Sequence, residues 1–202
     1  MATTPTTIMV IRHGEKPASK HTAPYGVDMK GNKDWYSLTV QGWQRAGALM
    51  KLFNPGTGPS PSILAVPTAI YASGFTEGEG VKDDISDSNS KRPMETITPL
   101  ARRLGITPNL NYSSGDEKRL VEEVMQQSGV VLICWQHGAI HDIAHHLVKD
   151  AKTTSPIPPP WPASRFDMVW VFTPPTSPDT IWGFVQVPEF LLSGDSDKVI
   201  TS

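Results

Sequence analysis

Two short apolar runs in this chain each lead into a histidine followed by a glycine. Residues 8–11 precede Arg12-His13-Gly14-Glu15, and residues 130–135 precede Gln136-His137-Gly138. Runs of this length that are rich in β-branched residues are typical of buried strands. Ligands bind at the carboxyl ends of strands in open α/β sheets. We therefore expect these two distant histidines to meet in one site.

The rest of the chain alternates between strand and helix patterns. We predict strands over residues 6–12, 69–73, 106–112, 130–136, 166–173 and 180–187, and helices over residues 40–53, 93–104, 116–127 and 139–149. This alternation predicts a single α/β domain over residues 1–202, with three layers and a mostly parallel sheet flanked by helices. The short connection near Pro174-Pro175 favours at least one antiparallel strand. The polar residues 193–202 are expected to form a flexible tail.

Composition excludes several classes of protein. The net charge of −2 and the pI near 6.3 disfavour a nucleic-acid binder. No apolar run approaches the ~20 residues of a membrane span, and the first residues do not resemble a signal peptide. The lone Cys134 lies in an apolar run and has no partner for an internal disulfide. We therefore expect a cytoplasmic protein without a nucleic-acid or membrane partner, and the sequence indicates no oligomeric state.

The residues beside the two strands suit the chemistry of a phosphoryl group. Arg12 offers a planar fork of donors that matches phosphate and keeps its charge. A neutral His13 is a competent nucleophile toward phosphorus, and His137 can donate to the charge that builds in the transition state. Gly14 and Gly138 lack a Cβ, so backbone can approach the bound group closely. A helix that follows Gly138 would also present its N-terminus to an anion.

Four motifs, in this order over residues 6–150, resemble those of the histidine phosphatase superfamily, the group that includes cofactor-dependent phosphoglycerate mutases. They are Arg12-His13-Gly14-Glu15, then Leu38-Thr39 with Gly42 and Arg45-Ala46, then Ile70-Tyr71-Ala72-Ser73 followed by Ser90-Lys91-Arg92-Pro93-Met94-Glu95-Thr96, and finally Gln136-His137-Gly138.

This resemblance implies a metal-independent phosphomonoester hydrolase that acts through a phosphohistidine on His13. It implies that Arg12, Arg92, His137 and Gly138 bind the phosphate together with His13. We expect no cofactor and a small phosphorylated substrate. Trp35, Tyr25 and Tyr36 belong to the polar segment after the first strand, where they either form an apolar wall for the substrate or pack beneath the loop.

The chain departs from the family pattern in residues 74–89, which read as an inserted loop. The loop contains the acidic residues Glu77, Glu79, Asp83, Asp84 and Asp87. It is either a solvated surface loop or a lid that supplies an acid, and its charge disfavours highly anionic substrates. The proton donor is left open among Glu77, Glu79, Asp83, Glu122 and Glu15. Glu15 is otherwise expected to orient a basic group or to form a salt bridge.

Three alternatives remain. A phosphomutase of the same fold is one, but Glu122 lacks the surroundings of a mutase acid, which favours hydrolysis. A catalytically inactive phosphate-binding or interaction protein is the second. The third is a zinc site, because His137, His141 and His145 recur every four residues and Asp142 follows His141. We predict no metal, since aspartate is shorter than the glutamate that usually accompanies such a helix.

Overall fold

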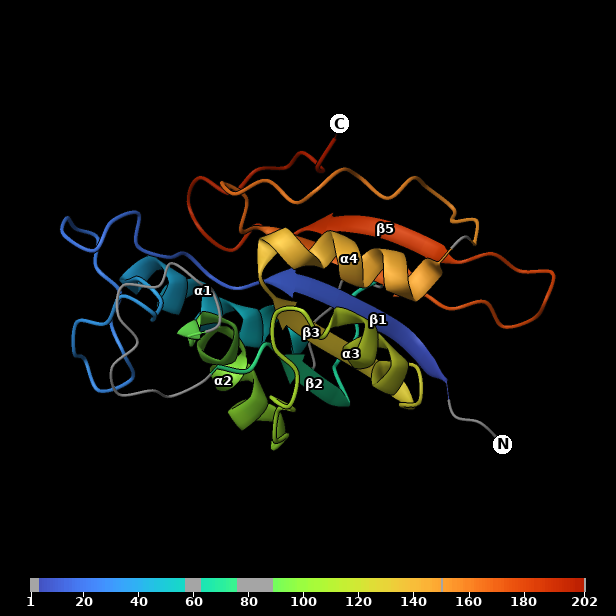
Figure 1. Ribbon diagram of the computed structural model, residues 1–202, viewed down its shortest axis with the longest axis horizontal. Helices are drawn as coiled ribbons and strands as arrows, with labels where there is room; N and C mark the ends of the chain where they lie inside the picture. Colours follow the sequence, from blue (N-terminus) through green and yellow to red (C-terminus); the bar gives the residue numbers. More distant parts are fainter. Residues whose placement is uncertain (1–3, 57–62, 76–88, 150, 202) are drawn as a thin grey trace.

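The computed structural model describes residues 4–56, 63–75, 89–149 and 151–201. Its elements, in chain order, are β1 (Pro5–Arg12), α1 (Val40–Phe53), β2 (Ala69–Ala72), α2 (Arg92–Leu104), α3 (Glu117–Val124), β3 (Gly129–Trp135), α4 (His137–Val148), β4 (Met168–Thr173) and β5 (Gly183–Pro188) (Figure 1).

The five strands form one mixed sheet in the order β2-β3-β1-β4-β5. β1 pairs in parallel with β3, and β3 pairs in parallel with β2. β4 is antiparallel to both β1 and β5, so β5 runs in the same direction as β1. The predicted α/β fold with an antiparallel strand is therefore confirmed. β1, which leads into His13, lies at the centre of the sheet.

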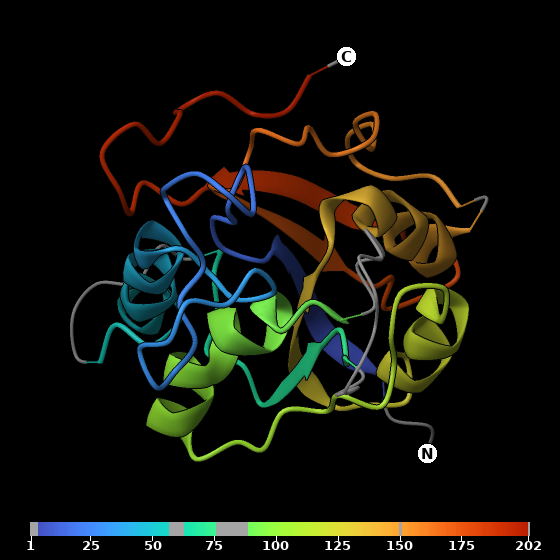
Figure 2. The ribbon, with the colours of Figure 1, turned by 60° about the vertical axis from the view of Figure 1, so that its left-hand side comes forward.

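The apolar residues of the sheet divide between two core clusters. Ile8 and Val10 of β1 belong to a cluster that includes residues of α3 and α4, whereas Met9 and Ile11 belong to one that includes residues of α1 and α2. Figure 2 shows α1 and α2 on one side of the sheet and α3 and α4 on the other. Because both sides of β1 are buried, the strand reads as a continuous apolar run rather than an alternating one.

Helix ends follow the expected local chemistry. Thr39 is the N-cap of α1, and its side chain accepts a hydrogen bond from the backbone N–H of Gly42. Pro93 lies in the first turn of α2, where a missing N–H costs nothing. Gly105 ends α2 in the left-handed conformation with φ 68°, which glycine adopts without steric cost.

Several predicted elements differ from those observed, and β4 and β5 begin two and three residues later than predicted. Residues 106–112 do not form a strand: Asn109 alone makes a bridge to Tyr71, and the preceding Pro108 has no N–H to extend a ladder. The helix predicted over residues 116–127 is shorter, from Glu117 to Val124. α4 begins at His137, two residues earlier than predicted.

The residues from 193 onward, predicted to form a flexible tail, make specific contacts instead. Ile200 is buried, and its backbone N–H and carbonyl both bond to the side chain of Gln186 on β5, at 3.0 and 2.9 Å. The polar character of this segment reflects such side chain–backbone bonds rather than solvation alone. Within the described residues, no helix is long and apolar enough to cross a membrane.

Candidate active site

The two histidine-bearing segments emerge side by side at one edge of the sheet. Arg12 and Trp135 are partners in the parallel register of β1 and β3. The backbone N–H of His13 then donates to the carbonyl of Trp135 at 3.1 Å. His137, which we expected to precede its helix, opens α4 directly after β3. Figure 1 shows that β1 ends where α4 begins, so the predicted pairing of the two strand ends is confirmed.

His13 is buried and its imidazole ring is held in one orientation. Nδ1 lies 2.7 Å from the carbonyl oxygen of Gly14. A carbonyl can only accept a hydrogen bond, so Nδ1 carries the proton and Nε2 keeps its lone pair. Burial lowers the pKa of His13 well below its usual value, and the neighbouring charge of Arg12 lowers it further, with smaller effects of Arg92 and Lys16. His13 is therefore a neutral imidazole among cations.

Arg12 is fixed by backbone carbonyls from a distant segment of the chain. Its Nη1 donates to the carbonyls of Ala163 at 2.7 Å and Arg165 at 2.8 Å, with a longer bond of 3.3 Å to Pro162. The guanidinium carbon lies 3.7 Å from the centre of the Phe166 ring, a distance at which a cation and an aromatic face attract. Arg12 is thus held rigidly beside His13.

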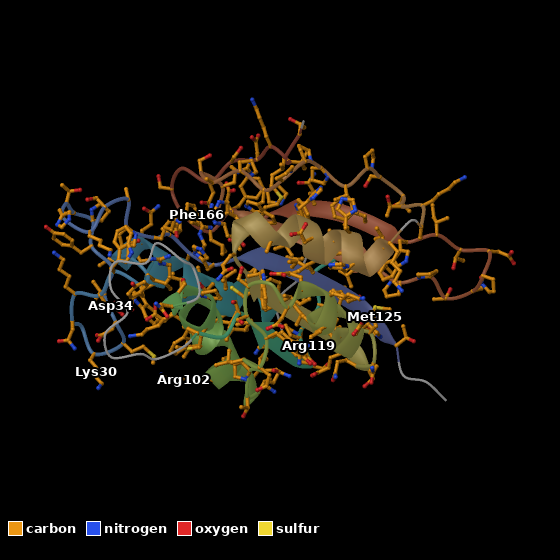
Figure 3. All side chains as sticks on the ribbon, viewed as in Figure 1. Lys30, Asp34, Arg102, Arg119, Met125 and Phe166 are labelled. Atoms are coloured by element: carbon orange, nitrogen blue, oxygen red, sulfur yellow. The ribbon has the colours of Figure 1, made fainter. Side chains whose placement is uncertain are left out.

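Phe166 is a residue of this site that the sequence did not indicate. Its ring centre lies 6.2 Å from that of His13, in addition to its contact with Arg12. Figure 3 labels Phe166 close to the carboxyl end of β1. No motif marks this position, because the contact joins segments about 150 residues apart.

Arg92, the first residue of α2, is buried on the other side of the site. Its Nη2 donates to the carbonyl of Trp35 at 2.6 Å, and its guanidinium carbon lies 5.9 Å from the centre of the Trp35 ring. Lys20 lies at the same distance from that ring. The effect of Arg92 on the pKa of His13 reflects the proximity of the two groups. The structure therefore places Arg12 and Arg92 near His13, with Trp35 beside Arg92.

Thr96 connects the loop that contains His13 to helix α2. Its hydroxyl oxygen accepts a hydrogen bond from the backbone N–H of Gly14 at 2.8 Å and donates one to the carbonyl of Arg92 at 2.7 Å. The buried side chain of Thr96 thus fixes the position of the segment that contains His13 relative to the segment that contains Arg92. Ser90, just before this helix, has a buried hydroxyl without a hydrogen-bond partner among the described residues.

The start of α1 packs against the same loop. The backbone N–H and hydroxyl of Thr39 both donate to the carbonyl of Glu15, at 3.0 and 3.2 Å. A Cβ on Gly42 would lie 2.6 Å from that carbonyl oxygen, so only glycine allows this approach. A Cβ on Gly14 would lie 3.0 Å from the carbonyl of Gly42. The threonine and glycine of the second motif therefore support the backbone of the His13 loop.

Glu15 forms a salt bridge rather than facing a substrate as a free acid. Its carboxylate accepts hydrogen bonds from Nη2 of Arg45 at 2.7 Å and from Nε at 3.1 Å. Arg45 is buried and also pairs with Glu189 and Asp195. Of the roles we considered for Glu15, the structure supports the salt bridge and not that of proton donor. Sequence reasoning missed Glu189 and Asp195, which lie more than 140 residues away from Arg45.

One further predicted site residue, Glu122, lies outside the constellation, whereas Gly138 follows His137 at the start of α4. Glu122 is exposed on α3 and borders a cavity together with His146 and Lys149. At about 1.5 Å per residue, His146 is some 14 Å along α4 from His137, so Glu122 is not brought to the site. Gly138 is exposed, and a Cβ there would contact nothing within 4 Å. Because this space is open, the close approach of a bound phosphate to Gly138 stays a prediction.

Glu77, Glu79 and Asp83, with Asp84 and Asp87, lie outside the described residues. Gly74 and Phe75 are described at its start, and the backbone N–H of Gly74 donates to the carbonyl of Tyr112 at 2.7 Å.

The histidines of α4 do not assemble a metal site among the described residues. The rings of His141 and His145 are in contact, with centres 4.4 Å apart, as expected for residues one turn apart on a helix. Across the described parts of the chain, no group of three or more His, Cys, Asp or Glu side chains is placed to hold a metal ion. The zinc alternative thus has no cluster of ligands there.

Comparison with protein-family models gives no match, and comparison with curated proteins gives none either. The interpretation of the site therefore rests on its own geometry.

Proposed function

We propose that this protein is a metal-independent phosphomonoester hydrolase that acts through a phosphohistidine on His13. One observation carries this proposal: a buried imidazole with Nδ1 bonded to the Gly14 carbonyl, and hence with a free Nε2 lone pair, lies beside Arg12 and Arg92. Two arginines supply positive charge for the oxygens of a phosphoryl group. The buried Ser90 hydroxyl, without a partner among the described residues, is a further candidate donor to that group.

In the first step, Nε2 of His13 attacks phosphorus as the bond between phosphorus and the ester oxygen breaks. The leaving alcohol takes a proton, and the phosphoryl group remains on Nε2 while Nδ1 keeps its proton. Water then attacks phosphorus, the bond to Nε2 breaks, and inorganic phosphate leaves. Arg12, Arg92 and His137 hold the phosphoryl oxygens throughout.

The leaving-group proton needs a source other than Glu15, because Arg45 engages that carboxylate. The proposed donors are the acidic residues Glu77, Glu79 and Asp83. Replacing the three carboxylates together by amides is expected to slow hydrolysis of an alkyl phosphate much more than that of an aryl phosphate, since a good leaving group needs little help from an acid.

We further infer a three-layer α/β arrangement like that of the histidine phosphatase superfamily. Two core clusters support it, one with residues of α3 and α4 and the other with residues of α1 and α2. For the substrate, we infer a small phosphomonoester with an apolar group. The ring of Phe166 lies beside Arg12, and the ring of Trp35 lies beside Arg92. A screen that finds a strong preference for an inositol polyphosphate would contradict this inference.

The test of the reaction is His13→Ala, assayed with an aryl phosphate with and without a chelator. We expect a loss of about a thousandfold or more in kcat, and no effect of the chelator on the native protein. His141→Ala is the matched control, since His141 contacts His145 on α4 and has no role in the proposed mechanism. Trapping with radiolabelled substrate should label the native protein and not the His13 variant, through an acid-labile bond. Equal turnover by the native protein and His13→Ala would exclude the mechanism.

A further inference from the structure

Arg45 is the centre of a buried ionic cluster. Its guanidinium bonds to three carboxylates, those of Glu15 at 2.7 Å, Glu189 at 2.8 Å and Asp195 at 2.7 Å. Only 2% of the Arg45 side chain is exposed, and the three carboxylates are at most 12% exposed. Ion pairs so far removed from solvent are strongly coupled, so removal of one partner leaves the remaining charges buried without full compensation.

The carboxylates come from two parts of the chain that are far apart in the sequence. Glu15 belongs to the loop that contains His13, whereas Glu189 and Asp195 belong to the C-terminal segment, residues 189–200. Asp195 is itself held in place, because its carboxylate accepts the backbone N–H groups of Leu191 and Leu192 at 2.8 and 3.0 Å. The C-terminal segment thus presents a preformed carboxylate to Arg45.

The cluster acts on the peptide that orients His13. The carbonyl of Gly14, which accepts the Nδ1 proton of His13, belongs to the peptide unit between Gly14 and Glu15. The plane of that unit depends on where Glu15 is held. The carbonyl of Glu15 is held by Thr39, and the side chain of Glu15 is held by Arg45. A chain of contacts therefore runs from Asp195 through Arg45 and Glu15 to the imidazole of His13.

The same segment also braces the carbonyls that hold Arg12. The carboxylate of Asp167 accepts the backbone N–H of Ser196 at 2.6 Å, and Arg165 donates to the carbonyl of Lys198 at 2.8 Å. Asp167 also accepts from Nε of Arg165 at 2.6 Å. Since the carbonyl of Arg165 binds Arg12, the C-terminal segment supports both Arg12 and His13.

We propose that Arg45 is a positioning residue through which the carboxylates of the C-terminal segment, Asp195 above all, fix the orientation and tautomer of His13. This proposal rests on the proposed function for its catalytic consequence, but the orientation of the ring can be measured without turnover.

The test is Asp195→Asn in the full chain, with Asp197→Asn as the matched control, because Asp197 is exposed and only two residues away. Small misplacements of a catalytic group cost up to about a hundredfold in rate. We expect kcat for an aryl phosphate to fall about tenfold or more, with little change in KM. The Asp197 variant should match the native protein.

Two measurements separate positioning from general destabilisation. In a double-mutant cycle, Glu15→Gln combined with Asp195→Asn should lower kcat no more than the worse single change, since both act through Arg45. NMR of protein with ¹⁵N-labelled histidine should show the Nδ1-protonated tautomer of His13 in the native protein and a mixture of tautomers in Asp195→Asn. Additive losses in kcat, or an unchanged tautomer in a folded Asp195 variant, would overturn the proposal. The tautomer result stands even if His13→Ala fails to abolish hydrolysis.

Discussion

Replacing Gly42 with alanine sets two opposing effects against each other at the start of α1. Alanine in a helix is favoured over glycine by about 0.5–1 kcal/mol. The new Cβ, however, would lie 2.6 Å from the carbonyl oxygen and 2.9 Å from the nitrogen of Glu15. Both are backbone atoms, so the helix or the His13 loop must move. Overpacking of this kind costs about 1–3 kcal/mol, so we expect a net destabilisation of about 0–2.5 kcal/mol, centred near 1 kcal/mol.

The matched control lies in the same helix. A Cβ on Gly47 would contact nothing within 4 Å, so Gly47→Ala should raise the free energy of unfolding by about 0.5–1 kcal/mol. For a chain of this size, 1 kcal/mol corresponds to about 2–4 °C in Tm. Urea unfolding and a thermal scan should therefore move the two variants in opposite directions. Gly42→Ala should also lower kcat, because Glu15 is displaced. If both variants are stabilised equally, the close packing inferred for Gly42 is incorrect.

Three further predictions concern buried polar groups. Thr96→Val should destabilise the fold by about 1–3 kcal/mol in urea, because it leaves the Gly14 N–H buried without an acceptor. Thr98→Val, which loses only bonds to its own helix, should cost clearly less, and equal costs would contradict the argument. Burial lowers the pKa of His13 below the ordinary histidine value of 6.5. The acid limb of the pH profile of kcat/KM should therefore have its midpoint below pH 6.5, and a midpoint above pH 6.5 would exclude a neutral buried nucleophile. Burial raises the pKa of Glu189 from 4.5 to about 8. Between these two pH values, Glu189 keeps a proton in the folded protein and releases it in the unfolded chain. The free energy of unfolding therefore falls as pH rises through this range. Glu189→Gln should remove that contribution in urea titrations from pH 5 to pH 8, and identical slopes for variant and native protein would refute it.

Local patterns in the sequence were sufficient for most elements of the sheet and for the core of the site. The apolar runs before His13 and His137 predicted two strands that the structure places side by side. Thr39 and Gly105 predicted helix ends because capping depends on neighbours within a few residues. The start of α4 was misplaced by two residues, because local patterns define helix ends only to within one or two residues.

Contacts over long sequence distances were not predictable from the same patterns. Arg45 looked like one residue of a helix motif, and nothing in its neighbourhood indicates that Glu189 and Asp195 complete its ion pairs. The packing of Phe166 on Arg12 is of the same kind. Such contacts depend on how β4 and the C-terminal segment return to the sheet, and local propensity contains no information about that path.

The central place of β1 in the sheet has a consequence for how the protein is synthesised. Its residues 8–11 are completely buried in the fold, yet the neighbours that cover its edges are β3 and β4, which begin at Gly129 and Met168. At about 5–20 residues per second, more than 5 s separate the emergence of β1 from that of its first partner. During that time the nascent chain exposes an apolar strand without a neighbour, a natural target for chaperones. The His13 site cannot assemble before most of the chain has left the ribosome.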